Sequence, residues 1–327
     1  MKIKNISTDN FVFFTSTGAI TIISFLFLGL SSIALGIISV MFTYIIYSAK
    51  PKSGKYIYTF FWLSMILFGC YLGILFKLSI EFYIFLFLLS NYYYIAYNHD
   101  PISDRAIPYF IIYSSLGTTL KDLSYHAAIA YLLGSIITLT MIAIVNRRKL
   151  EFINFQSSEF TQTLFTHPFQ NFVNSLIFSS FLFLTLYLPE QLKLERSYWA
   201  VMTFVVLLKP KDQGILTNTI KRFLGNLAGS IVVLIIMNID SKYRIFHFLV
   251  ILLCVFFLPT FLNFKYFLKT FGLTVFILIL LESSEFWKDP NYSLPFARIY
   301  ETFLGGLLAL LGSFIMKRIH QTILKET

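Results

Sequence analysis

Apolar runs of about 20 residues recur along almost the whole chain, and they constrain its fold more than any other feature. A helix of that length crosses a hydrocarbon layer of roughly 30 Å, because each residue adds about 1.5 Å. Charged residues make up only 13% of the chain, against roughly 25% in soluble domains. Apolar residues do not alternate with polar ones, as they would in a membrane β-barrel. The sequence therefore predicts an all-α polytopic membrane protein.

Twelve segments are predicted to span the membrane, six in each half of the chain. They cover residues 11–30, 32–48, 56–76, 78–97, 106–120, 127–146, 172–188, 197–208, 215–238, 245–262, 266–283 and 296–316. A polar segment, 147–171, separates the halves. We therefore divide the chain into a first membrane half, 1–146, a short cytoplasmic linker, 147–171, and a second membrane half, 172–327.

The distribution of positive charge predicts that both termini are cytoplasmic. Most of the 26 Lys and Arg residues lie in the termini and in the loops 49–55, 98–105, 147–171, 209–222 and 263–269. Cations gather in cytoplasmic loops of membrane proteins, so the net charge of +10 needs no nucleic-acid partner. We expect a multi-pass protein of the cell membrane, in a bacterium the inner membrane.

An echo between the halves suggests an internal duplication. The run Lys50-Pro51-Lys52, followed by Gly69-x-x-x-Gly73, reappears as Lys209-Pro210-Lys211, followed by Gly225-x-x-x-Gly229. Because six spans per repeat is an even number, the two repeats would have the same orientation in the membrane. The sequence thus predicts two parallel six-helix repeats, an arrangement that occurs in transporters.

Two stretches of the second half carry a family signature. The first reads Tyr198-Trp199-Ala200-Val201-Met202-Thr203, then Lys209-Pro210, then Lys221-Arg222-x-x-Gly225-x-x-x-Gly229. The second reads Arg298-Ile299-Tyr300-Glu301-Thr302-x-x-Gly305-Gly306. They resemble the fusaric acid resistance (FUSC) family, whose clan includes bacterial aromatic-acid exporters and plant aluminium-activated malate transporters. Many bacterial relatives carry a cytosolic domain between the halves, where this chain has only the linker, so no role of that domain is carried over.

The basic turn between the two pieces of the first stretch supplies candidate substrate ligands. Clustered cations raise the local concentration of anions, although the same cations also serve as cytoplasmic anchors. Asn226 follows Arg222 by four residues and shares its helix face, where it would bind a carboxylate or join two helices. The predicted substrate-binding residues are Arg222, Asn226, Lys209, Lys211, Thr203 and Arg298.

Glu301 is the candidate for proton coupling, because ionisable groups inside membrane spans are functional candidates by default. A structural pair with Arg298, three residues earlier, is the alternative. Four glycines that allow close helix approach are predicted to pack helices: Gly225, Gly229, Gly305 and Gly306.

The apolar run of residues 199–208 is short for a span. Ten residues cover only about 15 Å. Either the helix extends back through residues 193–197, or it is a half-length helix of the kind that marks transport sites.

These observations leave three functional hypotheses. The resemblance implies a transporter that exports small organic anions, most readily aromatic carboxylates, coupled to protons. An anion channel of the malate-transporter type would need no proton carrier, and a membrane assembly subunit would move no anion at all. We expect a substitution of Glu301 to separate carrier from channel.

No catalytic or nucleotide-binding pattern is recognisable in the sequence. The five histidines lack metal-ligand spacing, and neither a Walker motif nor a nucleophile elbow occurs. We therefore expect no enzyme, no metal and no cofactor. The expected partners are the lipid bilayer, the organic anion, and either a second copy of the chain in a homodimer or a periplasmic adaptor.

Overall fold

The computed structural model describes residues 3–49, 55–98, 100–146, 168–194, 196–210, 214–240, 244–285 and 291–326. Within these ranges the regular structure is helical, with twelve α-helices. They are α1 (Ile3–Ile23), α2 (Ile33–Tyr47), α3 (Tyr56–Phe76), α4 (Ile80–Ala96), α5 (Pro101–Thr119), α6 (Tyr125–Asn146), α8 (Pro168–Gln191), α9 (Tyr198–Leu207), α10 (Ile215–Asp240), α11 (Arg244–Leu262), α12 (Tyr266–Glu285) and α13 (Ser293–Glu326). A π-helical turn, η1 (Ser24–Leu28), and a 3₁₀ turn, η2 (Leu30–Ser32), separate α1 from α2.

Each of the twelve predicted segments coincides with one of these helices, and the all-α membrane class is confirmed. Seven of the described helices are long and apolar enough to cross a bilayer. They are Thr8–Leu28, Leu30–Tyr47, Tyr56–Phe76, Tyr125–Asn146, Phe169–Gln191, Ile215–Ile239 and Ser293–Ile319. The apolar helices Ile80–Ala96, Tyr198–Leu207 and Leu249–Leu262 are shorter. Twelve complete spans are therefore not established, and the parallel repeats and the side of the termini stay predictions.

Capping residues mark the N-terminal ends of two helices. The Ser79 hydroxyl accepts a hydrogen bond from the Phe82 N–H at the start of α4. At the start of α5 the Asp100 carboxylate accepts from the N–H groups of residues 102 and 103, and Pro101 occupies the first helical position. Side-chain caps satisfy amides that the first helical turn leaves without partners, and proline lacks that amide. α8 begins at Pro168, a few residues inside the predicted linker.

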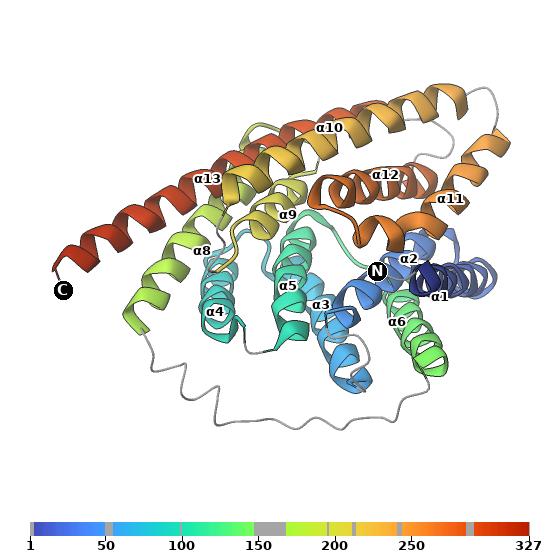
Figure 1. Ribbon diagram of the computed structural model, residues 1–327, viewed down its shortest axis with the longest axis horizontal. Helices are drawn as coiled ribbons and strands as arrows, with labels where there is room; N and C mark the ends of the chain where they lie inside the picture. Colours follow the sequence, from blue (N-terminus) through green and yellow to red (C-terminus); the bar gives the residue numbers. More distant parts are fainter. Residues whose placement is uncertain are drawn as a thin grey trace. The chain divides into compact units, whose positions relative to one another are not determined.

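The chain forms two compact units, and each unit combines helices from both halves of the sequence. Unit 1 comprises Met1–Ser64, Leu123–Phe152 and Lys221–Ile299, and unit 2 comprises Met65–Asp122, Ile153–Ile220 and Tyr300–Thr327. In unit 1, α1, α2 and α6 pack on one another, and α11 packs on α1 and α12 (Figure 1). Gly36 and Gly134 lie where α2 and α6 meet: a Cβ atom at Gly134 would lie 2.7 Å from the Gly36 carbonyl oxygen. Small residues thus bring these two helices into backbone contact, as is common in membranes.

In unit 2, α8 packs on α4 and α9, and α5 packs on α4 and α9 (Figure 1). Aromatic rings fill the space between α4, α8 and α9: the Phe178 ring centre lies 5.2 Å from that of Phe204 and 5.6 Å from that of Tyr94. Gly73 and Gly117 bring α3 and α5 together, since a Cβ atom at either would lie about 3 Å from the Cα atom of the other. The short helix α9 is therefore enclosed by longer helices.

Candidate functional site

The short helix α9 is the centre of unit 2. It begins at Tyr198 and ends at Leu207, so it covers about 15 Å, half of a hydrocarbon layer. Eight of its ten side chains are buried, among them Trp199 and Thr203. Pro210 follows the helix, and a proline has no N–H with which to continue it. The structure thus favours the half-length helix over the alternative that extended it back through residues 193–197.

Glu301 of α13 lies at the N-terminal end of α9. Its side chain is fully buried, and its Oε1 atom accepts a hydrogen bond from the Arg196 N–H over 2.8 Å. The Arg196 carbonyl in turn accepts from the Trp199 N–H in the first turn of the helix. The Glu301 carboxyl thus lies at the partially positive end of the α9 helix dipole. The hydrogen bond joins α13 to the loop between α8 and α9.

One turn further along, α13 and α9 meet backbone to backbone. A Cβ atom at Gly305 would overlap the Ala200 carbonyl oxygen and would lie 3.0 Å from the Cβ atom of Thr203. At Gly306 it would lie 3.0 Å from Cγ2 of Thr219. Glycine at these two positions lets α13 approach closely enough for Glu301 to reach the Arg196 amide.

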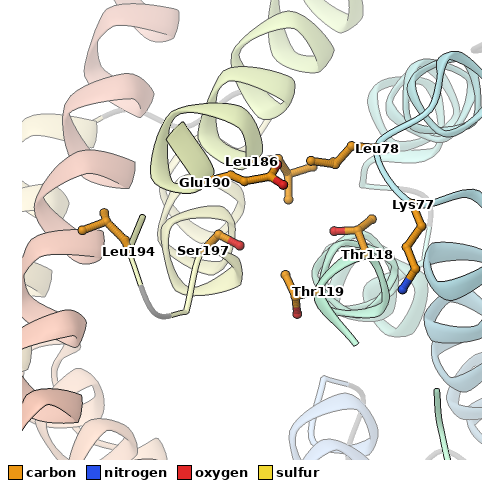
Figure 2. Close-up of a pocket in the computed structure, with 8 residues that line it drawn as sticks. All are labelled: Lys77, Leu78, Thr118, Thr119, Leu186, Glu190, Leu194 and Ser197. Carbon is orange, nitrogen blue, oxygen red and sulfur yellow. The ribbon is translucent and has the colours of Figure 1, made fainter. Parts of the chain in front are cut away.

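A cavity of about 460 Å³ opens beside the start of α9 (Figure 2). The ends of α3, α5 and α8 and the loop before α9 form its wall, which contains Lys77, Leu78, Thr118, Thr119, Leu186, Glu190, Leu194 and Ser197. Three leucines, three hydroxyls, a carboxylate and an ammonium group make the lining amphipathic. At roughly 30 Å³ per molecule the volume admits on the order of 15 waters, or one small organic molecule.

Several polar side chains of the cavity donate hydrogen bonds to backbone carbonyls. The Lys77 ammonium donates a hydrogen bond to the Leu120 carbonyl, just beyond the last turn of α5. In Figure 2, Lys77 and Thr119 lie on opposite sides of the end of α5, and the hydroxyls of Thr118 and Ser197 point toward one another. A lysine beside the C-terminal end of a helix is stabilised by the partial negative charge there. The Thr118 and Thr119 hydroxyls also donate to backbone carbonyls, those of residues 115 and 116 in α5.

The loop between α8 and α9 contacts both the cavity and Glu301. Ser197 lines the cavity, and the neighbouring Arg196 donates its N–H to Glu301. A change in the charge of Glu301 thus acts one residue away from the cavity wall. The predicted topology puts Lys77, Lys193 and Arg196 on the same, non-cytoplasmic side.

The cavity lining was not among the predicted site residues. The signal for it was present in that topology, because the loop ends at residues 77, 121 and 193–196 were all assigned to one side of the membrane. Sequence reasoning used this pattern only to orient the chain.

The predicted substrate-binding residues lie in both units. Arg222, Asn226 and Arg298 belong to unit 1 and are buried, whereas Thr203 and Lys209 belong to unit 2, the first buried and the second exposed. Lys211 lies outside the described residues. Their role in substrate binding stays a prediction.

Asn226 has a packing role in unit 1. Its Oδ1 atom accepts a hydrogen bond from the Thr274 hydroxyl of α12. On either side of it, a Cβ atom at Gly225 would lie 2.9 Å from the Phe267 carbonyl oxygen, and one at Gly229 would lie 3.0 Å from the Cβ atom of Thr274. These contacts make α10 and α12 a closely packed pair that the amide oxygen of Asn226 helps to join, and carboxylate binding by its amide N–H groups stays a prediction.

Comparison with known proteins identifies the second half of the chain. Residues 180–312 match a family described as fusaric acid resistance protein-like, which confirms the resemblance predicted from the sequence. The matched region runs from the middle of α8 through α9–α12 into α13 and includes both Glu301 and the Arg196 loop. No curated protein and no solved structure matches the chain. The apolar helices indicate a multi-pass membrane protein, and the family match suggests a role in transport or efflux.

Proposed function

We propose that this chain, of which residues 180–312 match a family described as fusaric acid resistance protein-like, exports small organic anions in exchange for protons. Aromatic carboxylates are the first candidates, because the clan it resembles includes aromatic-acid exporters. Transport, rather than a channel or an assembly role, follows most directly from a buried carboxylate next to a cavity.

Glu301 is the observation that carries the proposal. It lies in the span Ser293–Ile319 and is fully buried, and ionisable groups are rare in such places unless they serve transport. An ionised carboxylate makes a charge-assisted hydrogen bond with the Arg196 N–H, which is roughly twice as strong as a neutral one. Proton uptake by Glu301 therefore weakens the attachment of the α8–α9 loop to α13.

This loop links protonation to the cavity. Leu194 and Ser197 form part of the cavity wall, on either side of the residue that is bonded to Glu301. Loosening the loop would let the cavity widen or close around a bound molecule. A carrier needs such a proton-dependent change in access, whereas an open pore does not.

On the predicted cytoplasmic side, we propose that Arg222, Lys209 and Lys211 attract the anion before it enters. Positive side chains at a mouth raise the local concentration of anions, and the effect weakens with ionic strength. Thr203 and Arg298 are further substrate ligands in this proposal. The cations of the predicted cytoplasmic side thus attract the anion, and Glu301 exchanges protons beside the cavity.

The test is flux into proteoliposomes that contain purified protein and carry a pH gradient, with benzoate as the probe. We expect Glu301→Gln to lower gradient-driven uptake at least about tenfold, because the amide oxygen still accepts the Arg196 N–H but cannot take up a proton. The matched control is Glu81→Gln, an exposed carboxylate at the start of α4 in the same unit. We expect this variant to transport like the parent.

Other outcomes point to the alternatives. If Glu301→Gln keeps full gradient-driven uptake, proton coupling through this residue is wrong. If both the parent and the variant show the same ohmic anion conductance, the chain is a channel of the malate-transporter type. If neither moves any organic anion and the protein co-purifies with another membrane protein in fixed ratio, it is an assembly subunit.

A further inference from the structure

The cavity of unit 2 presents mainly hydrogen-bond acceptors to a molecule inside it. The Lys77 ammonium already donates to the Leu120 carbonyl, and the Thr118 and Thr119 hydroxyls donate to carbonyls of their own helix. A hydroxyl that has donated its proton still accepts through its lone pairs. Within the part of the chain that the structure describes, no group bonds to the Glu190 carboxylate, which can only accept. A molecule that matches this wall is therefore a hydrogen-bond donor.

Helix ends add negative potential to the wall. α3, α5 and α8 all end there, and the C-terminal end of a helix carries partial negative charge. The Lys77 ammonium offsets this charge at the end of α5, and the Glu301 carboxyl already lies at the positive end of α9. Three further cations lie in the adjacent loops but outside the wall: Lys121, Lys193 and Arg196. With the Glu190 carboxylate the wall is negative on balance, and such a cleft concentrates cations.

Three leucines give the same cavity an apolar part. Leu78 follows α3, Leu186 belongs to α8, and Leu194 lies in the loop before α9. Figure 2 shows Glu190 extending from α8 toward Leu78. The volume of about 460 Å³ lies within the range of roughly 300–1,000 Å³ that is typical of small-molecule sites. The lining therefore fits a molecule with one charged end and one apolar end.

We infer that this cavity binds a small organic cation, with its protonated amine at Glu190 and Ser197 and its apolar body against the three leucines. An ammonium group donates up to three hydrogen bonds, and those to a carboxylate are charge-assisted. An organic anion of the same size would place its charge against the Glu190 carboxylate. Cation binding does not depend on the proposed export of anions, which such a wall would release rather than hold.

Protection of a cysteine in the cavity wall tests this inference. The parent for the test carries Cys70→Ala and Cys254→Ala, and Ser197→Cys places a thiol in the wall. Its reaction with methyl methanethiosulfonate, an uncharged reagent, is followed in detergent at neutral pH and constant ionic strength. The competing probes are benzylammonium, benzoate and benzyl alcohol, which share a phenyl ring and differ in charge. The concentration of each probe that halves the reaction rate measures its affinity.

We expect benzylammonium to protect the thiol at a concentration at least about tenfold lower than benzoate does. Glu190→Gln should remove most of this advantage, whereas Glu81→Gln, at an exposed carboxylate outside the wall, should leave it unchanged. Protection by benzoate at the same concentration as benzylammonium would overturn the inference. An advantage that survives Glu190→Gln, or no protection by any of the three probes, would overturn it as well. If Ser197→Cys does not fold, Thr118→Cys gives the same comparison.

Discussion

Replacing Gly305 by alanine tests whether close approach of α13 and α9 holds the candidate site together. The added Cβ atom would overlap the Ala200 carbonyl oxygen and would lie 3.0 Å from the Cβ atom of Thr203, where carbons normally keep about 3.5–4.0 Å. The helices must therefore separate by about 0.5 Å or more at this point. Overpacking of this kind costs about 1–3 kcal/mol, and misalignment of Glu301 with the Arg196 N–H costs about 1 kcal/mol more.

Gly18 of α1 provides the matched control, because a Cβ atom there meets nothing within 4 Å. Both glycines lie inside helices, so the gain in helix propensity, about 1 kcal/mol for each alanine, cancels in the comparison. We expect Gly305→Ala to be less stable than Gly18→Ala by about 2–4 kcal/mol, or roughly 5–15 °C in the midpoint of thermal unfolding in detergent. If Gly305→Ala unfolds at or above the temperature of Gly18→Ala, the close packing of α13 on α9 is wrong.

Two further substitutions probe single contacts. Lys77→Met should lower the free energy of unfolding by about 1 kcal/mol, because the Leu120 carbonyl loses its donor; denaturant titration against the exposed control Lys121→Met measures this. Asn226→Ala should cost about 0.5–1.5 kcal/mol in stability, because it removes a hydrogen bond between α10 and α12, while the Thr274 hydroxyl keeps the Thr270 carbonyl as an acceptor. The KM for benzoate should stay within about twofold of the parent value, and a rise of tenfold or more would assign Asn226 to the substrate instead.

The sequence predicted the helices well because lipid leaves the backbone few choices. Every polar backbone group in hydrocarbon must be satisfied within its own segment, so an apolar run implies a helix and its ends imply the helix ends. The same logic detected the shortness of α9, although it left open whether the helix extended backward. In the structure α9 begins at Tyr198 and does not extend backward. The Trp199 and Ala200 N–H groups there donate to carbonyls only three residues earlier.

The candidate site was only partly accessible to this logic. Glu301 stood out as an ionisable side chain in an apolar run, but its partner is the backbone N–H of Arg196, and a backbone group has no signature in the sequence. The cavity wall joins residues such as Lys77, Thr118 and Glu190 that lie far apart in the chain. Their proximity depends on how α3, α5 and α8 pack, which the spacing of apolar residues does not encode.

The bond between Glu301 and Arg196 also sets an order of assembly during synthesis. Its two ends are 105 residues apart, and the intervening α10, α11 and α12 contribute mainly to unit 1. A ten-residue helix is too short to cross the lipid by itself, and of its neighbours α5 and α8 are made before it. Its remaining contacts in unit 2 wait until α13 has been made. Unit 2, which begins in the third helix, is therefore completed by the last one, and a chain that stops short of Glu301 leaves the Arg196 N–H before α9 without its carboxylate acceptor.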